Sequence, residues 1–121
     1  MATQELTIEN FPQIVEKGIV FVDFWATWCG PCRQFSPIYD KVSEKHPDIV
    51  FGKVDTDAQQ ELAGMAQVQS IPTVMAFRDG VGVFRTAGVM SASELEAIIQ
   101  QVRDLDMDKV RAEAEAAEEQ A

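Results

Sequence analysis

The sequence predicts an α/β fold with a central mixed β-sheet of roughly four to five strands, flanked by about four helices and followed by an acidic C-terminal extension. Three observations lead to this fold class. Short β-rich apolar runs alternate with segments of helical periodicity, which favours parallel strands joined by helices. The hairpin signal Asp79-Gly80 then joins two further strands, which should be antiparallel. Finally, 121 residues with 46% hydrophobic side chains suffice for one domain with one core.

The N-terminal half is expected to alternate strands and helices. A short helix, preceded by a brief edge strand, is indicated by apolar residues at helical spacing: Phe11, Ile14 and Val15. Residues 19–24 form an apolar run typical of a parallel strand that is covered on both faces. A helix is expected from Cys29 to about His46, followed by a strand at residues 49–54 and a helix at about residues 58–65.

The C-terminal half should contain a hairpin and a closing helix. Strands are expected at residues 73–78 and 81–86, on either side of the hairpin turn. Ser91 and Glu94 have the spacing of a capping box, which predicts a helix start. The apolar face of that helix is supplied by four residues at helical spacing: Leu95, Ile98, Ile99 and Val102.

An acidic segment rich in Ala and Glu follows, so we divide the chain into a domain at residues 1–104 and a tail at residues 105–121. From Asp104 onward seven acids and two bases contribute -5 to the total formal charge of -10. Ala and Glu favour helix, yet the tail has few apolar side chains with which to dock. It is expected to be a frayed, solvated helix or a disordered extension, and the alternative is a partner-binding segment.

Charge and hydropathy exclude several classes of partner. A net charge of -10 repels nucleic acid. The sequence has no run of the roughly 20 apolar residues needed to span a bilayer, and its first ten residues lack the features of a signal peptide. We therefore expect a cytoplasmic protein that contacts neither nucleic acid nor membrane. We also expect a monomer, although charge and hydropathy do not determine the oligomeric state.

The two cysteines lie within one stretch, Cys29-Gly30-Pro31-Cys32. A disulfide across so short a loop removes little chain entropy, and stable disulfides are rare in the cytosol. A reactive pair or a metal-binding pair is therefore favoured over a structural staple. Structural zinc usually needs four Cys or His ligands, and His46 is the only other candidate, so we expect no metal and no cofactor.

The position of these cysteines suits thiol-disulfide exchange. The thiolate is the form that attacks a disulfide, and a helix start favours an anion at Cys29 through its free N–H groups and its dipole. Cys32, one turn further on, can close a disulfide and expel the reduced substrate. Gly30 allows a substrate backbone to approach, while Pro31 suits the first turn and stiffens the dithiol.

The segment Trp25-Ala26-Thr27-Trp28-Cys29-Gly30-Pro31-Cys32 closely resembles the active-site sequence of thioredoxins. The resemblance runs from about Leu6 to Val102 and includes these further matches: Val22-Asp23-Phe24, Lys53-Val54-Asp55, Ile71-Pro72-Thr73, Asp79-Gly80 and Gly88. It implies the thioredoxin fold and a protein-disulfide reductase that acts in electron transport. It also implies two kinds of partner, oxidised protein substrates and an upstream thioredoxin reductase.

The resemblance adds two candidate catalytic residues to Cys29 and Cys32. Asp23 interrupts an apolar strand, so it is either a buried acid or a solvated strand-end acid, and burial would raise its pKa enough for proton exchange with a thiol near neutral pH. In thioredoxins the matching aspartate is buried behind the disulfide and assists proton transfer to the resolving cysteine. Lys53 matches a lysine that approaches this aspartate, and the alternative is an exposed strand lysine.

The resemblance also implies a substrate-binding patch. Ile71-Pro72 matches a cis-proline loop beside the active site, where the backbone of Ile71 would pair with an extended substrate segment. Around Cys29 the patch would comprise six residues: Trp28, Gly30, Pro31, Ile71, Pro72 and Gly88. The following Val89-Met90 is bulkier than the Gly-Ala of many thioredoxins, which we expect to narrow the patch or alter partner choice.

Two other functions compete with the reductase. A disulfide oxidase or isomerase would use the same chemistry at a different reduction potential. A non-catalytic binding module would use the apolar patch alone. Loss of activity when both cysteines are replaced by serine would favour the redox enzyme over the module.

Overall fold

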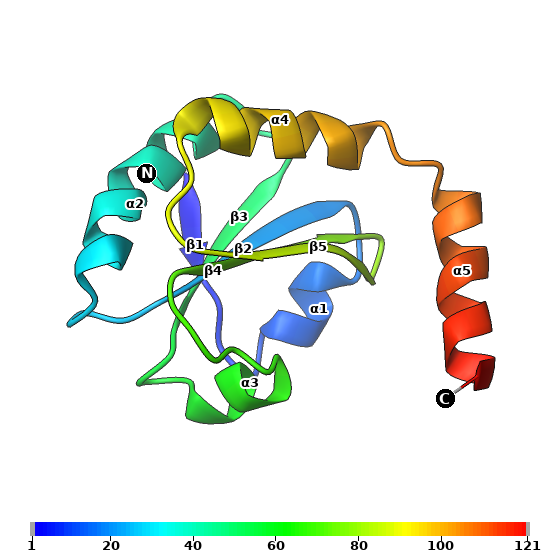
Figure 1. The fold of residues 1–121 in the computed structure, drawn as a ribbon, viewed down its shortest axis with the longest axis horizontal. Coiled ribbons are helices and arrows are strands. Elements are labelled where there is room, and N and C mark those ends of the chain that lie inside the picture. Colours follow the sequence, from blue (N-terminus) through cyan, green and yellow to red (C-terminus); the bar gives the residue numbers. More distant parts are fainter. Residues whose placement is uncertain (1, 121) are drawn as a thin grey trace.

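In a computed structural model, residues 2–120 form a three-layer α/β fold in which helices cover both faces of a five-stranded sheet (Figure 1). Met1, in the predicted domain at residues 1–104, and Ala121, in the predicted tail at residues 105–121, lie outside the described residues. The strands are β1 (Thr3–Glu5), β2 (Ile19–Trp25), β3 (Val50–Asp55), β4 (Thr73–Arg78) and β5 (Val81–Ala87). The helices are α1 (Phe11–Val15), α2 (Gly30–Ser43), α3 (Gln60–Met65), α4 (Ala92–Arg103) and α5 (Met107–Gln120).

The sheet is mixed, as predicted, with strand order β1-β3-β2-β4-β5. β2 lies at its centre, parallel to β3 and antiparallel to β4. β1 pairs with β3 in parallel, and β5 pairs with β4 in the predicted hairpin. The hairpin turn uses positive φ angles at Asp79 (+50°) and Gly80 (+86°), a conformation that these two residue types accept more readily than others.

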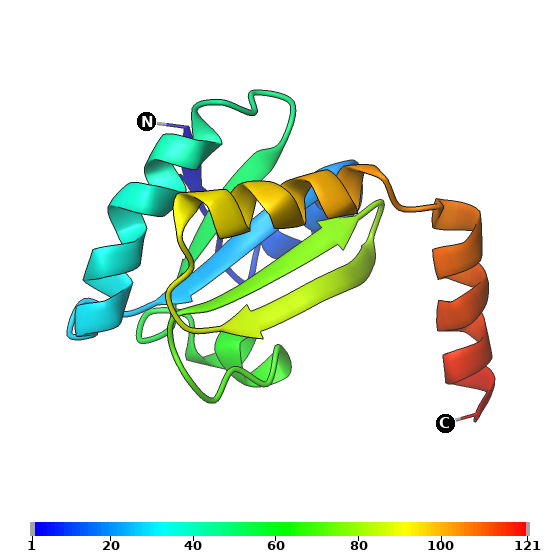
Figure 2. The ribbon, with the colours of Figure 1, turned by 45° about the horizontal axis from the view of Figure 1, so that its top comes forward.

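Successive side chains of β2 enter two different cores, because strand residues alternate between the faces of a sheet. Phe21 packs under α2 and α4 with Phe35, Phe51 and Leu95. The core on the α1 and α3 face contains Leu6, Val20, Val22, Phe24, Val54 and Leu62. Figure 2 shows the layers from a second angle, with α4 crossing over the sheet. This burial on both faces explains why apolar side chains occupy every position but Asp23 in the run at residues 19–24 that predicted the strand.

Two helix starts are fixed by side-chain caps. Cys29 is the N-cap of α2, and Pro31 lies in its first turn, where the missing N–H has no intrahelical role. The predicted capping box begins α4: Ser91 Oγ accepts from the Glu94 N–H, and the Glu94 side chain accepts from the Ser91 N–H. The first of these caps places a sulfur atom directly at a helix N-terminus.

Helix α5 follows α4 after a short connection and contacts the sheet near β5. The Arg78 guanidinium binds this connection by donating to the carbonyl oxygens of Val102, Arg103 and Leu105 at 2.9–3.1 Å. Arg111 of α5 also lies 3.8 Å from Asp79 at the hairpin turn. Within residues 2–120, no helix combines the length and apolar character needed to cross a lipid bilayer.

Candidate active site

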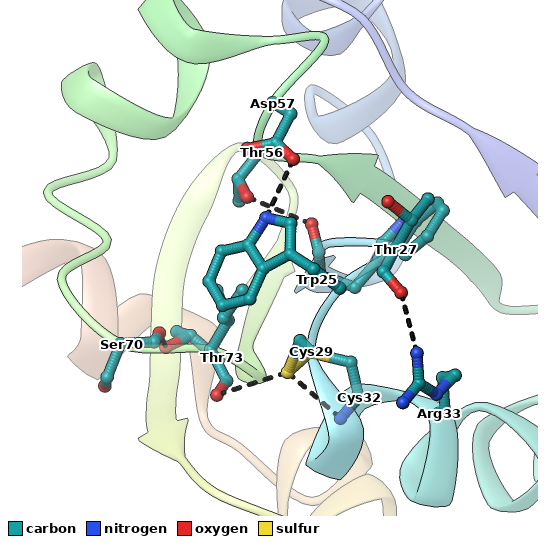
Figure 3. The surroundings of a disulfide bond; sticks show 11 residues. Trp25, Thr27, Cys29, Cys32, Arg33, Thr56, Asp57, Ser70 and Thr73 are labelled. Carbon is teal, nitrogen blue, oxygen red and sulfur yellow. Dashed lines mark hydrogen bonds between the residues drawn. A yellow bond between two sulfur atoms is a disulfide. The ribbon is translucent and has the colours of Figure 1, made fainter.

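Cys29 and Cys32 form a disulfide across the first turn of α2, beside the end of β2 (Figure 3). Strand β2 ends at Trp25, and the short loop after it delivers Cys29 to the N-cap position. Its Sγ accepts a hydrogen bond from the Cys32 backbone N–H at 3.2 Å. Only 4% of Cys29 and 3% of Cys32 is exposed. The same N–H and the helix dipole would stabilise a Cys29 thiolate once the disulfide opens.

The loop between α3 and β4 lies against the disulfide. The Ile71-Pro72 peptide bond is cis, as the resemblance implied, and the Ile71 carbonyl oxygen is 3.8 Å from Cys29 Sγ. The Gly88 N–H donates to the Pro72 carbonyl at 2.8 Å, which joins this loop to the end of β5. Gly88 has a φ of +100°, a conformation that side-chain-bearing residues rarely adopt. The fold therefore brings residues far apart in sequence to one edge around Cys29.

The predicted patch is uneven in exposure. Trp28 is 67% exposed, and Gly30, Pro31 and Gly88 are also exposed, whereas Pro72 is buried. Pro72 therefore shapes the loop rather than adding surface. The Trp28 indole N–H donates to Asp57 Oδ2 at 2.9 Å, which fixes the orientation of the ring. Asp57 was not among the predicted site residues, because no local pattern indicates that a residue 29 positions away would meet Trp28.

The two bulky residues after Gly88 differ in where they point. Met90 is buried and belongs to the core under α2 and α4, so it does not narrow the patch. Val89 is exposed on the surface. Of the two substitutions from the common Gly-Ala pattern, only Val89 therefore offers side-chain surface to an approaching protein.

Asp23 is a buried acid, not a solvated strand-end acid. It lies within β2 and is 1% exposed, and its Oδ1 has no hydrogen-bond partner among residues 2–120. Burial raises the pKa of the carboxyl from 3.8 to about 7, partly offset by the positive charge of Lys53 and reinforced by the negative charge of Asp40. A carboxyl with this pKa exchanges its proton near neutral pH, as a proton-transfer group for a thiol must.

Lys53 lies opposite Asp23 in the β2–β3 register, but its ammonium bonds elsewhere. Its Nζ donates to Ser36 Oγ on α2 at 2.8 Å and lies 5.3 Å from the centre of the Trp25 ring. The ion pairs found within residues 2–120 do not include one between Lys53 and Asp23. The ammonium borders a pocket of about 210 Å³ that Cys32 and Ser36 also line.

The structure thus adds three side chains that the sequence did not single out: Ser36, Asp40 and Asp57. Each acts on a predicted residue across a long sequence separation or through the interior of the fold. Among residues 2–120, no group of three or more Cys, His, Asp and Glu side chains is arranged to hold a metal ion. The arrangement of a capped sulfur, a second sulfur one turn away and a buried acid suits two-electron thiol-disulfide exchange.

Comparison with known proteins supports this chemistry. The family model "Thioredoxin" matches residues 2–101. A putative thioredoxin 2 of Streptomyces coelicolor is 53% identical over 111 residues, which cover 91% of this chain and 83% of the relative. The thioredoxin of Coprinus comatus is 38% identical over 97 residues, which cover 78% of this chain and 91% of the relative.

Solved structures show the same likeness in three dimensions. The crystal structure of a thioredoxin of Malassezia sympodialis has a TM-score of 0.74 at 34% identity, covering 82% of this chain and 89% of that chain. A chain from work on the thiol resolving mechanism of yeast mitochondrial 1-Cys peroxiredoxin via glutathione/thioredoxin systems has a TM-score of 0.76 at 28% identity. This match covers 83% of this chain and 95% of that chain.

Proposed function

Because the chain belongs to the thioredoxin family of thiol-disulfide oxidoreductases, we propose that it reduces disulfides in oxidised proteins with Cys29 as nucleophile and Cys32 as resolving thiol. The observation that carries this assignment is the position of Cys29 Sγ at the N-cap of α2, where it accepts the Cys32 N–H. A negative charge on this sulfur is favoured there by the N–H group and by the helix dipole. No observation within residues 2–120 specifically favours the alternatives, which are a disulfide oxidase, a disulfide isomerase and a binding module.

The proposed exchange has two steps. The Cys29 thiolate attacks one sulfur of a protein disulfide, which forms a mixed disulfide and releases one target thiolate. Cys32 then gives its proton to Asp23 and attacks Cys29 Sγ, which forms the Cys29–Cys32 disulfide and releases the second target thiolate. The target gains two electrons, and the protein is left in the disulfide form of this structure. Protons on the released thiolates come from solvent or from Asp23.

Asp23 is the proposed proton acceptor because it is buried beneath α2 with an unpartnered carboxylate oxygen and a pKa near neutrality. The proposed role of Lys53 is to moderate that pKa through its positive charge. Both residues project from neighbouring strands, so their relative position depends on the sheet.

Substrate proteins are proposed to dock on the edge that carries Trp28 and the Ile71-Pro72 loop. An extended substrate segment would pair with the backbone of Ile71, whose carbonyl already lies beside Cys29 Sγ. The exposed ring of Trp28 and the surfaces of Gly30, Pro31 and Gly88 would contact side chains of the substrate. Pro72 would support this docking surface from below by setting the path of the loop.

Further proposals concern the setting in which the protein works. We propose electron supply from an upstream thioredoxin reductase, a cytoplasmic location, a monomeric form, and no association with nucleic acid or membrane. Residues 1–104 are the proposed thioredoxin domain and residues 105–121 the acidic tail. That division is supported by the family match, which ends at residue 101, and by the end of α4 at Arg103.

The test is reduction of a disulfide-containing protein by wild type and by two single variants. We expect Cys29→Ser to be inactive, and Cys32→Ser to accumulate a mixed disulfide at Cys29 that mass spectrometry identifies. Activity retained in Cys29→Ser would overturn the assignment. A redox titration against glutathione separates a reductant from an oxidase, since about 30 mV corresponds to 1.4 kcal/mol in this two-electron couple.

A further inference from the structure

Ser36 links the catalytic helix to the lysine that faces the buried acid. It lies on α2, one turn after Cys32, and its Oγ accepts a hydrogen bond from Lys53 Nζ at 2.8 Å. Within residues 2–120, this hydroxyl is the acceptor found for the Lys53 ammonium. The same ammonium lies 5.3 Å from the Trp25 ring centre, so two contacts hold it, and Lys53 lines the same pocket as Cys32.

We propose that Ser36 is a positioning residue that holds the Lys53 ammonium beside Asp23 and thereby sets how readily Asp23 exchanges a proton with Cys32. This inference rests on the proton-transfer role proposed for Asp23. It deepens that role, because it assigns the control of the acid to a hydroxyl on the helix that carries both cysteines.

The position of the Lys53 ammonium depends on which acceptors it can reach. A flexible four-carbon stem lets the ammonium reach water, a protein acceptor or a nearby carboxylate. At Ser36 the ammonium stands close enough for its charge to lower the pKa of Asp23, but no ion pair with Asp23 forms. Without the hydroxyl, hydration and rotamer freedom draw the ammonium toward water, where solvent screens its charge. The influence of Lys53 on Asp23 should then weaken.

Other groups that face Asp23 remain in place when Ser36 is changed. From α2 these are Tyr39 and Asp40, and the negative charge of Asp40 raises the pKa of Asp23. From β3 the facing charged group is Lys53, whose ammonium Ser36 binds and which is the group expected to move. Strand β4 contributes apolar side chains to this core, Val74 and Ala76, which do not titrate. A change in the titration of Asp23 in a Ser36 variant can therefore be traced to Lys53.

The experiment follows the Asp23 carboxyl by ¹³C NMR as a function of pH in the oxidised full-length protein, where the cysteines do not titrate. We expect Ser36→Ala to raise the pKa of Asp23 by about 0.5, a fraction of the effect of a nearby opposite charge. Ser36→Thr keeps the hydroxyl and should restore the wild-type value. Gln34→Ala, at an exposed position of the same helix, is the matched control and should leave the titration unchanged.

A Lys53→Met background identifies the route of the effect. There Ser36→Ala should produce no further change, because the charge that Ser36 positions is gone. An unchanged Asp23 titration in Ser36→Ala, or an equal change in the Lys53→Met background, would overturn the proposal. Alanine favours helix, so Ser36→Ala should leave α2 intact, which circular dichroism verifies.

A kinetic measurement separates this inference from the function on which it rests. The pH profile for resolution of a Cys29 mixed disulfide should move in the same direction as the Asp23 titration in Ser36→Ala. Suppose that Ser36→Ala changes the pKa of Asp23 but not the pH profile of resolution. That result would refute proton transfer between Asp23 and Cys32, and with it the proposed effect of Ser36 on Cys32. Ser36 would then still influence the pKa of Asp23 through Lys53, but without an effect on the reaction.

Discussion

Replacing the buried acid with its neutral isostere should reveal the cost of ionising it inside the fold. In Asp23→Asn no charge has to be buried at high pH, whereas in wild type the carboxyl ionises with a pKa of about 7 instead of 3.8. Because the pKa is higher in the folded state, the contribution of Asp23 to stability is fully present below about pH 4 and is lost as pH rises through about 7.

The size of the effect follows from the two pKa values. A difference of about 3 between 3.8 and 7, at 1.36 kcal/mol for each unit, gives about 4 kcal/mol. The free energy of unfolding of Asp23→Asn minus that of wild type should therefore increase by about 4 kcal/mol between about pH 4 and pH 8. Urea unfolding of both oxidised proteins at several pH values measures this difference, in which the other titrating groups largely cancel.

A matched control tests whether burial is the cause. Asp108→Asn also removes one carboxylate, but from an exposed position on α5, so it should not reproduce the increase of about 4 kcal/mol expected for Asp23→Asn. A flat difference for Asp23→Asn across the same range would refute the reasoning. It would mean that the folded protein hydrates or neutralises this carboxylate.

Three further predictions concern the scaffold. Ser91→Ala removes the N-cap of α4 and should cost about 1 kcal/mol of unfolding free energy, and an unchanged urea midpoint would contradict the role of the cap. Gly52→Ala should cost about 1–3 kcal/mol in the same assay, because a Cβ there would overlap the buried side chain of Leu6; an equally stable variant would show that this core can yield. Arg103→Ala should raise the pKa of Asp48 from about 2 toward 3.8, since the hydrogen bond from Arg103 is the main cause of its low value. Wild type should then lose the stability from this contact as pH falls from about 4 to 2, whereas the variant should not, and an Asp48 titration unchanged in NMR would exclude the contact in solution.

Regular elements were predictable where periodicity and turn chemistry agree. The strand at residues 73–78 was predicted at its observed bounds, because β4 is an apolar run ended by the Asp79-Gly80 turn. The predicted strand at residues 19–24 was one residue short, because Trp25 still pairs with Asp55 of β3. Local patterns thus located the centres of the elements, and pairing between strands decided their ends.

Helix ends were less predictable, because hydrogen bonds within turns override helix propensity. Helix α3 begins at Gln60 and not near Ala58, since Asp55 Oδ1 accepts the N–H groups of Asp57 and Ala58 and holds this stretch in a turn. Helix α2 ends at Ser43, three residues before the predicted His46. The N–H groups of residues 45 and 46 donate to the carbonyl oxygens three positions back, those of Val42 and Ser43. This is the pattern of a tighter 3₁₀ turn, so the α-helix ends before it.

The residues of the candidate site also differ in how far the sequence alone could predict them. Cys29 and Cys32 could be found from spacing alone, and the helix start after β2 explains their chemistry. Burial of Asp23 could be suspected from its apolar strand but required the structure to establish. The contact of Lys53 with Ser36 joins a strand to a helix 17 residues away, and no sequence period encodes it. Such contacts depend on how α2 settles on the sheet.

The central position of β2 separates the two halves of the chemistry into parts that can be changed independently. Both neighbours of β2 hold its register, and a slip by one residue would turn Asp23 into the opposite core, so the acid is anchored by the sheet as a whole. The dipeptide between the cysteines is exposed on the first turn of α2 and makes no demand on that register. Substitutions at Gly30 and Pro31 should therefore leave Asp23 at its place in the sheet.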